Sequence, residues 1–450
     1  MTHRDAPTLQ SLAVDLASAK TTSRVRVEEC LSRISDPDGE GARTFIRVNH
    51  REAPAAADAM DSLRRAAAAP SPFAGIPITV KDLFDVMGEV TAAGSRVLAE
   101  RPAAKTDATS VQMLRRAGFV IVGRTNMTEF AYSGLGLNPH YGTPLCSYDR
   151  EHGRAPGGST SGGAIAVADG MADAALGTDT GGSCRIPAAF NGLTGWKPTA
   201  RRISRAGMVP LSSSLDSVGV IARSVACCAT LDSILSGEAT MLAGHESSLE
   251  GLRLVVPTNI VLDDLDREVA DAFGSALTQL AAAGVRIVHA VIPEFGDIRS
   301  INGKGGLSAA ESHAWHRSLL ETQSGRYDPR VLSRILRGAE QSAQDYIALL
   351  ETRRAITQSA NKRLSEYDAL VMPTVPIIPP LLADLQSDDA YGRINMLALR
   401  NPAMINAIDG CAISLPIGSG APPVGLTLAA TAGSDARLLS LAARVESNLQ

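Results

Sequence analysis

Aromatic residues, excess charge and long apolar runs are all scarce in this sequence. Aromatics make up 4% of its 450 residues, and its formal net charge is −4. Few aromatics argue mildly against a large aromatic pocket, and the lack of a basic cluster argues against a nucleic-acid partner. No stretch of about 18 uncharged apolar residues occurs, so we expect no membrane span. The N-terminal MTHRDAPTLQ also lacks the apolar run of a signal peptide, so we predict a cytoplasmic protein.

Cysteine and histidine form no metal-binding pattern. The cysteines lack CxxC spacing and are Cys30, Cys146, Cys184, Cys227, Cys228 and Cys411. Reduced thiols in a cytoplasm are the simplest interpretation. Glu311, His313 and His316 share a predicted helix with only loose spacing, which favours a solvated helix face over a metal site. We therefore expect no metal and no cofactor.

Apolar residues, by contrast, reach 45% and gather in short runs. Residues 76–80 are predicted as a buried strand, 107–117 as a helix and 119–122 as the next strand. This order favours parallel strands with helices on both faces. The sequence predicts an α/β fold, a three-layer α/β/α sandwich around a central mixed, largely parallel β-sheet.

The length alone suggests three domains, at about 150 residues each. No low-complexity linker divides the chain, however, and the Pro-rich patch 373–380 is expected to be a loop followed by further strands. We therefore predict a single domain over residues 1–450. It would carry an outer helical N-terminal segment (about 1–70) and a divergent helical insertion (about 300–400).

The remaining predicted elements follow from apolar periodicity and from helix-start residues. Helices are expected at 9–20, 24–34, 55–68, 164–168, 186–190, 224–235, 266–283, 307–323, 329–339, 343–365 and 435–448. Strands are expected at 44–48, 172–176, 252–256, 285–291, 369–372, 412–416 and 424–428. Thr8, Ser23 and Asp107 are predicted helix caps, and Pro54 is predicted to precede a helix.

Two glycine-serine loops stand out between residues 155 and 187. The first reads GGSTSGG over residues 157–163, and the second reads GGS over residues 181–183. Glycine permits positive φ and lets backbone N–H groups approach a ligand closely. Ser159 and Ser183 each follow a Gly-Gly pair, and a short apolar helix and strand between them would hold their hydroxyls at a fixed distance.

A serine hydroxyl needs a base before it becomes a useful nucleophile. Histidine is the usual base, but none lies in the glycine loops. Lysine serves if burial lowers its pKa, whereas arginine does not deprotonate in proteins. Lys81 is one of only six lysines, and it ends an apolar run. Lys81 is therefore the candidate base.

These motifs resemble the amidase signature family of serine hydrolases. The matching segments are GIPITVKDLFD, GGSTSGG, ALGTDTGGS and CRIPAAFNGLTGWKPT. The similarity continues through GRTNMTEFAYSGLGLNPHYGTP and reaches the C-terminal AISLPIG and PPVGLTLAA, and about 238–401 matches least. The resemblance implies the fold predicted above and a Ser–cis-Ser–Lys site in which Lys81 accepts a proton from Ser159, and Ser159 accepts one from Ser183. It also implies an oxyanion hole at Thr180, Gly181, Gly182 and Ser183, and an acyl pocket near Ala131 and Tyr132.

Plainer interpretations remain open at several of these positions. Ser183 would be read as a helix cap if it stood alone, and Lys81 as a strand-end lysine with a solvated head. Thr160 and Ser161 are rival hydroxyls to Ser159. Cys184 is a stronger nucleophile than serine, although a packed side chain is the expected role.

The roles of the neighbouring residues are also open. Ala131 and Tyr132 could simply pack. Asp179 and Arg185 are expected to hold the loop of Ser183 by hydrogen bonds, with a contact from Arg185 to a substrate carboxylate as the alternative.

Three functions are carried forward. The first is a stand-alone amidase that acts on a small-molecule amide through a Ser183 acyl-enzyme and releases ammonia or an amine. The second is the glutamine-hydrolysing subunit of a tRNA-dependent amidotransferase, which requires a partner. The third is a non-catalytic phosphate-binding module, which the absence of GxxxxGK[ST] disfavours. A homodimer is left open.

Overall fold

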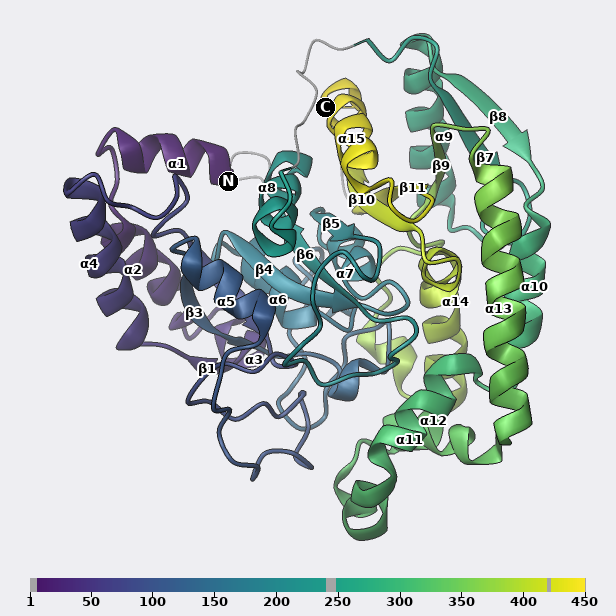
Figure 1. The fold of residues 1–450 in the computed structure, drawn as a ribbon, viewed down its shortest axis with the longest axis horizontal. Coiled ribbons are helices and arrows are strands. Elements are labelled where there is room, and N and C mark those ends of the chain that lie inside the picture. The colour runs from purple at the N-terminus through teal and green to yellow at the C-terminus, as the bar shows by residue number, and fades with distance from the viewer. Residues whose placement is uncertain (1–5, 240–247, 419–421, 450) are drawn as a thin grey trace.

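The computed structural model describes residues 6–239, 248–418 and 422–449, so the first half of the N-terminal stretch discussed above lies outside it. Its central feature is one sheet of eleven strands in the order β1-β3-β2-β4-β6-β5-β10-β11-β9-β7-β8 (Figure 1). The strands are β1 (Phe45–Val48), β2 (Pro77–Lys81), β3 (Val120–Thr125), β4 (Ala174–Asp179), β5 (Thr194–Lys197), β6 (Ser217–Ala222), β7 (Arg253–Pro257), β8 (Arg286–Ala290), β9 (Ala369–Pro373), β10 (Cys411–Ile417) and β11 (Val424–Ala430).

Helices make up most of the rest of the described chain. They are α1 (Leu9–Ala17), α2 (Ser23–Ile34), α3 (Gly41–Thr44), α4 (Glu52–Arg65), α5 (Thr109–Arg116), α6 (Ser161–Ala168), α7 (Arg185–Phe190), α8 (Val225–Ser236), α9 (Arg267–Ala282), α10 (Pro293–Ile301), α11 (Gly306–Gln323), α12 (Pro329–Leu336), α13 (Ala343–Leu364), α14 (Asp388–Ala407) and α15 (Asp435–Leu449). Short 3-10 helices occur at Glu129–Ala131, Ser324–Arg326, Arg337–Glu340 and Leu382–Leu385. Within the described residues, no helix combines the length and apolarity that a membrane crossing requires.

The sheet is mixed, as predicted. Strands β3, β2 and β4 run parallel, and so do β9, β7 and β8, whereas the pairs between these blocks and the β1–β3 pair are antiparallel. Strands β2 and β4 are parallel neighbours. Their carboxyl ends therefore lie at the same edge of the sheet, where ligand sites of α/β folds are usually found.

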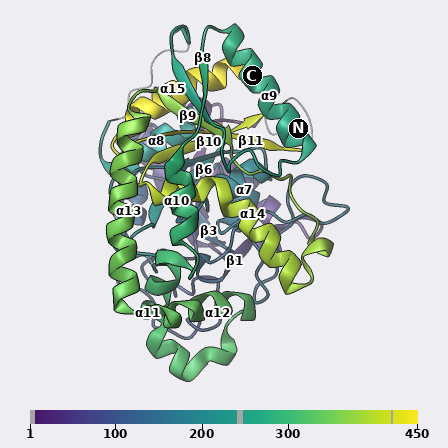
Figure 2. The same ribbon diagram turned by 90° about the vertical axis from the view of Figure 1, so that its right-hand side faces the viewer.

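Helices cover both faces of the sheet, which confirms the predicted three-layer fold. On one face α8, α9 and α15 pack on the strands and on one another. On the other face α6 and α7 pack on the central strands, and α14 packs on α7 and β10. Helices α10, α13 and α14 line the right-hand side of Figure 1 and face the viewer in Figure 2. Helices α11 and α12 lie at the end of the molecule opposite α15 in both views.

Two predicted helix starts need correction. Thr8 caps α1 as expected, with its side chain and that of the N3 residue forming a capping box. Helix α2 instead begins at Ser23, and Thr22 is its cap. Ser23 lies inside the helix, where its hydroxyl donates to the carbonyl of Gly75 at 2.7 Å, and the side chain of Thr22 accepts from the N–H of Val25.

Helices α4 and α5 show the same kind of deviation. Helix α4 begins at Glu52, so Pro54 lies inside its first turn rather than before it. The first N–H groups of a helix have no intrahelical partner, so proline costs no hydrogen bond there. Asp107 does not cap α5, because its carboxylate accepts from the N–H of Met87 at 2.7 Å.

Strands β5 and β6 and helices α10 and α14 were not predicted. Each of the two strands contains a glycine, Gly195 or Gly219, which weakens a strand pattern. Helix α14 carries Pro402 in its interior, which ordinarily indicates a helix end. The missed helix matters most, because it lies over the loops of the site.

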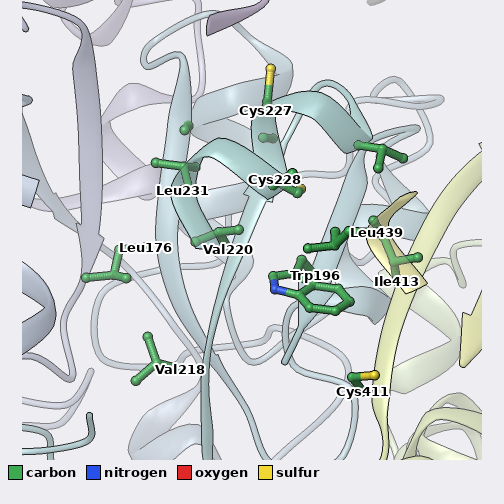
Figure 3. Packing of buried hydrophobic residues seen from close by; sticks show 14 of the residues in the cluster. Leu176, Trp196, Val218, Val220, Cys227, Cys228, Leu231, Cys411, Ile413 and Leu439 are labelled. Carbon is green, nitrogen blue, oxygen red and sulfur yellow. The ribbon is translucent and has the colours of Figure 1, made fainter. Parts of the chain in front are cut away.

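The largest core lies between the sheet and the helical layer that contains α8 and α15. Figure 3 shows Trp196 of β5, Val220 of β6, Ile413 of β10 and Leu439 of α15 converging there. All four are buried. The indole N–H of Trp196 donates to Asp232 at 2.9 Å, so the polar group of this large side chain is satisfied inside the core.

We predict that Leu439→Ala lowers the free energy of unfolding by about 2–5 kcal/mol, because it leaves a cavity in this core. Leu336→Ala, the same change at a helix position that is 45% exposed, is the matched control and is expected to cost less than about 1 kcal/mol. Urea unfolding followed by circular dichroism measures both. Equal losses in the two variants would contradict this account of the core.

Candidate active site

Lys81 is the last residue of β2, and its parallel neighbour β4 ends at Asp179. Helix α6 begins at Ser161, directly after the cis peptide region of the first glycine loop, residues 157–163. The second glycine loop, residues 180–183, follows β4 and is called the nucleophile loop below. The strand register therefore brings Lys81 and both glycine loops to one edge of the sheet.

The Lys81 amine lies among three hydroxyl groups. Its Nζ is 2.8 Å from Ser159 Oγ, 3.0 Å from Thr160 Oγ1 and 2.8 Å from Thr178 Oγ1. Lys81 is fully buried, so the alternative of a solvated strand-end lysine is wrong. Within the described chain, no carboxylate forms an ion pair with this amine.

Burial lowers the pKa of Lys81 to about 8, because desolvation penalises the charged ammonium. The negative charges of Asp179 and Asp216 oppose this shift without cancelling it. About a tenth of the amine is therefore uncharged at pH 7, far more than for an ordinary lysine, and a general base requires this neutral form.

Ser159 and Ser183 are brought together through the backbone. The peptide bond between Gly158 and Ser159 is cis, and the N–H of Thr160 donates to the carbonyl of Ser183 at 3.2 Å. The described chain contains no hydrogen bond between the two serine hydroxyls. The structure thus joins Lys81 to Ser159 directly, whereas the second step of the expected relay requires a further approach of Ser159 to Ser183.

Asp179 and Arg185 hold the nucleophile loop, as the sequence predicted. Both are fully buried, and Arg185 Nε and Nη2 donate to the carboxylate at 3.0 and 2.9 Å. Burial alone would raise the pKa of Asp179, but the adjacent guanidinium outweighs it and lowers that pKa. Asp179 therefore stays ionised and accepts from the N–H groups of Gly182 at 2.9 Å and Cys184 at 3.2 Å.

This network corrects one of the expected oxyanion donors. Because the N–H of Gly182 already donates to Asp179, it is not a free donor for an oxyanion. The N–H groups of Gly181 and Ser183 have no hydrogen-bond partner in the described parts of the chain. The hydroxyl of Thr180 donates to buried Asp216 at 2.6 Å, which fixes the start of the nucleophile loop.

Cys184 lies beside Ser183, but its environment is that of an unreactive thiol. It is fully buried, and its thiol donates to the carbonyl of Thr178 at 3.4 Å. Burial raises the pKa of the Cys184 thiol to about 12, so the thiolate is not populated near neutral pH. This environment agrees with the expected packing role.

Residues 126–138 form a second wall of the site. The N–H of Thr128 donates to the carbonyl of Ser159 at 3.1 Å, and the carbonyl of Gly134 accepts from Gly158 N at 2.8 Å. Ala131 and Tyr132 lie between these contacts. Burial raises the pKa of Tyr132 to about 12. Its backbone carbonyl accepts from Arg334 of α12 at 2.9 Å, so this residue contacts the divergent segment.

Helix α14, missed from the sequence, joins both walls. Asn395 Oδ1 accepts from Ser133 Oγ and Gly134 N, each at 2.8 Å. Eleven residues later, Asn406 Nδ2 donates to Asp179 at 2.9 Å and Asn406 Oδ1 accepts from Arg185 at 2.6 Å. One helix thus fixes residues 126–138 and the nucleophile loop relative to each other.

Sequence reasoning also missed Thr178 as a partner of Lys81 and misjudged α11. Thr178 lies in the quoted ALGTDTGGS segment, yet only its strand register with β2 identifies it as a partner of Lys81. The predicted solvated helix face is wrong, because His316 is fully buried and Glu311 is partly buried. His316 instead packs against Phe130 with ring centroids 4.3 Å apart.

Comparison with known proteins extends this picture to the whole chain. The Amidase family model matches residues 26–439. The 2-amino-5-chloromuconic acid deaminase of Comamonas testosteroni is 36% identical over 438 residues, which cover 96% of this chain and 92% of that protein. The A subunit of the glutamyl-tRNA(Gln) amidotransferase of Chromohalobacter salexigens is 34% identical over 470 residues, 97% of this chain and 95% of that one.

A solved structure supports the same assignment. A crystal structure of an amidase, 30% identical in sequence, has a TM-score of 0.89 and covers 99% of this chain and 100% of that chain. Since the family model and these relatives extend over nearly the entire sequence, the protein belongs to the amidase signature family.

Proposed function

We propose that this C–N hydrolase cleaves a small-molecule carboxylic amide through an acyl-enzyme on Ser183, with Lys81 as the base and Ser159 as the proton relay. The observation that carries the proposal is the 2.8 Å contact between Lys81 Nζ and Ser159 Oγ at the end of a buried strand. This contact places Ser159, which lies next to the nucleophile loop, beside the Lys81 amine, which burial keeps partly uncharged.

The hydrogen bonds around Lys81 support a defined proton direction. A lysine ammonium has three donors and no acceptor, so loss of one proton leaves two N–H groups and one lone pair. The hydroxyl of Thr160 donates to the carbonyl of Thr178 at 3.4 Å, which leaves its oxygen free to accept. If Thr160 and Thr178 accept the two N–H groups, the lone pair is directed at the proton of Ser159.

The proposed acylation then balances as follows. Ser159 gives its proton to Lys81 and takes the proton of Ser183, while Ser183 Oγ bonds to the carbonyl carbon and the carbonyl oxygen becomes an oxyanion. As the oxyanion collapses, the C–N bond breaks. The leaving nitrogen takes a proton from Ser159, which regains one from Lys81. Water then releases the acid by the same transfers and restores Ser183.

Backbone donors would stabilise the oxyanion. The N–H groups of Gly181 and Ser183 are the proposed pair, with the N–H of Thr180 beside them, whereas Gly182 contributes by holding the loop on Asp179. Loss of one such donor typically costs about 3–4 kcal/mol in the transition state. The Asp179–Arg185 pair therefore acts indirectly, by keeping the loop in one conformation.

The glutamine-hydrolysing subunit remains the second candidate. It is favoured by the 34% identity to the Chromohalobacter amidotransferase chain over 97% of this chain. The deaminase relative, at 36% identity, favours a stand-alone enzyme that acts on a small molecule. The single domain, the homodimer and the cytoplasmic location stay predictions.

A substrate panel separates the two candidates. We predict that the isolated chain releases ammonia or an amine from at least one simple primary amide, carbamoyl compound or anilide, because the proposed relay is contained within this chain. Ammonia release is measured by a coupled assay, and Ser183→Ala is the blank. Activity confined to glutamine in the presence of a partner protein would favour the amidotransferase function.

The acylation rate is predicted to rise with pH around an apparent pKa of about 8, the value that burial gives Lys81. Below that pH the amine is protonated and cannot accept, so the rate falls about tenfold per pH unit. Above it the rate reaches a plateau. Stopped-flow kinetics between about pH 6 and 10 measure this pH–rate profile. If the rate of Lys81→Ala still rises with pH around 8, the assignment of Lys81 as the base is contradicted.

Ser183 and Cys184 are predicted to differ sharply as targets. Ser183→Ala should abolish labelling by a fluorophosphonate probe and lower turnover at least about a thousandfold. Cys184→Ala should keep turnover within about threefold, because a buried neutral thiol contributes packing alone. Mass spectrometry of the labelled peptide identifies the modified atom. Label on Cys184, or full activity without Ser183, would refute the acyl-enzyme assignment.

A further inference from the structure

Helix α11 of the divergent segment forms an unexpected contact with residues 212–216. Glu311 Oε2 accepts from Ser212 Oγ at 2.5 Å and from Ser214 N at 3.0 Å. Its other oxygen accepts from Ser214 Oγ and, at 2.9 Å, from Tyr346 OH of α13. One carboxylate therefore collects four hydrogen bonds, three of them from a loop about a hundred residues earlier in the chain.

Residues 212–216 lead directly to the nucleophile loop. The carboxylate of Asp216 accepts from Leu211 N at 3.0 Å and from Ser212 N at 3.1 Å. It also accepts from Thr180 Oγ1 at 2.6 Å. Asp216 and Thr180 are both buried. A continuous path of hydrogen bonds thus runs from Glu311 through Ser212 and Asp216 to Thr180, the first residue of the nucleophile loop.

The hydrogen-bond partners of the Glu311 carboxylate in the described chain are all uncharged groups. Among the described residues no lysine or arginine forms an ion pair with it, so its neutral partners are three hydroxyls and one N–H. Hydrogen bonds to an ionised acceptor are roughly twice as strong as those between neutral groups. Such an acceptor restrains an otherwise polar, serine-rich loop (Leu211-Ser212-Ser213-Ser214) that has no helix or strand of its own.

We propose that Glu311 is a positioning residue, which fixes the proposed oxyanion donors of the nucleophile loop through residues 212–216 and Asp216. The inference rests on the proposed acyl-enzyme function of Ser183. It gives the divergent segment a role in the chemical step as well as in the shape of the substrate pocket.

The role has a definite kinetic signature. A loop that loses its restraint still binds substrate but presents misaligned N–H groups to the oxyanion, so kcat falls while KM stays nearly constant. Misplacement by a fraction of an ångström is enough for a loss of about tenfold. A purely structural role would lower the melting temperature and the yield of folded protein without this division between kcat and KM.

The experiment compares Glu311→Ala, Glu311→Gln and the matched control Tyr346→Phe. The control removes the hydrogen bond from Tyr346 to this carboxylate and keeps the three hydrogen bonds that Ser212 and Ser214 donate to it. The readouts are kcat and KM on the best amide of the substrate panel, the rate of fluorophosphonate labelling of Ser183, and the melting temperature.

We expect Glu311→Ala to lower kcat and the labelling rate about tenfold with KM within about twofold. Glu311→Gln should recover most of this loss, because its amide oxygen still accepts from the loop. Tyr346→Phe should match the wild type. If Glu311→Ala does not fold, the Ser212→Ala/Ser214→Ala double variant, which removes the two side-chain donors, is expected to show the same division between kcat and KM.

Two results overturn the inference, and they are distinguishable. If the wild type is labelled at Ser183 and Glu311→Ala, or the double variant in its place, reacts as fast, the positioning role is wrong and the proposed function stands. If the wild type is not labelled at Ser183, the proposed function fails and the inference fails with it.

Discussion

The site depends on an amine held inside the protein by hydroxyl groups rather than by a carboxylate. A paired carboxylate would stabilise the charged form of Lys81 and keep it protonated, whereas desolvation favours the neutral form. Ser159, Thr160 and Thr178 accept or donate without adding charge. In the proposed mechanism, the buried strand β2 therefore supplies a lysine as the base, a role that histidine usually takes.

The second constraint is the alignment of two loops from different parts of the chain. The nucleophile loop is tied to Asp179, and residues 126–138 are tied to the cis peptide of Ser159. Asn395 and Asn406 of α14 join the two. Helix α14 begins in the divergent segment and extends beyond it, and these two asparagines thus fix the two loops relative to each other.

The sequence predicted the parts that depend on local chemistry. The apolar runs at residues 76–80 and 172–176 were sufficient to predict β2 and β4 to within a few residues. What could not be predicted depends on contacts between distant residues. Helix α14 was not predicted because Pro402 lies inside it. The hydrogen bond from Gly182 N–H to Asp179 belongs to a network that includes Asn406 of α14, and the sequence does not show this long-range contact. Glu311 looks like a solvated residue in the sequence because three of its four hydrogen bonds come from residues about a hundred positions earlier.

The protonation of Lys81 itself is the most direct test of this account. The chain has only six lysines, so labelling with ¹³Cε-lysine gives a simple NMR spectrum, and the signal lost in Lys81→Met identifies the residue. The account predicts that this signal titrates near pH 8, the value to which burial lowers the pKa of Lys81. A signal that titrates near the ordinary lysine value of about 10.4 would contradict it.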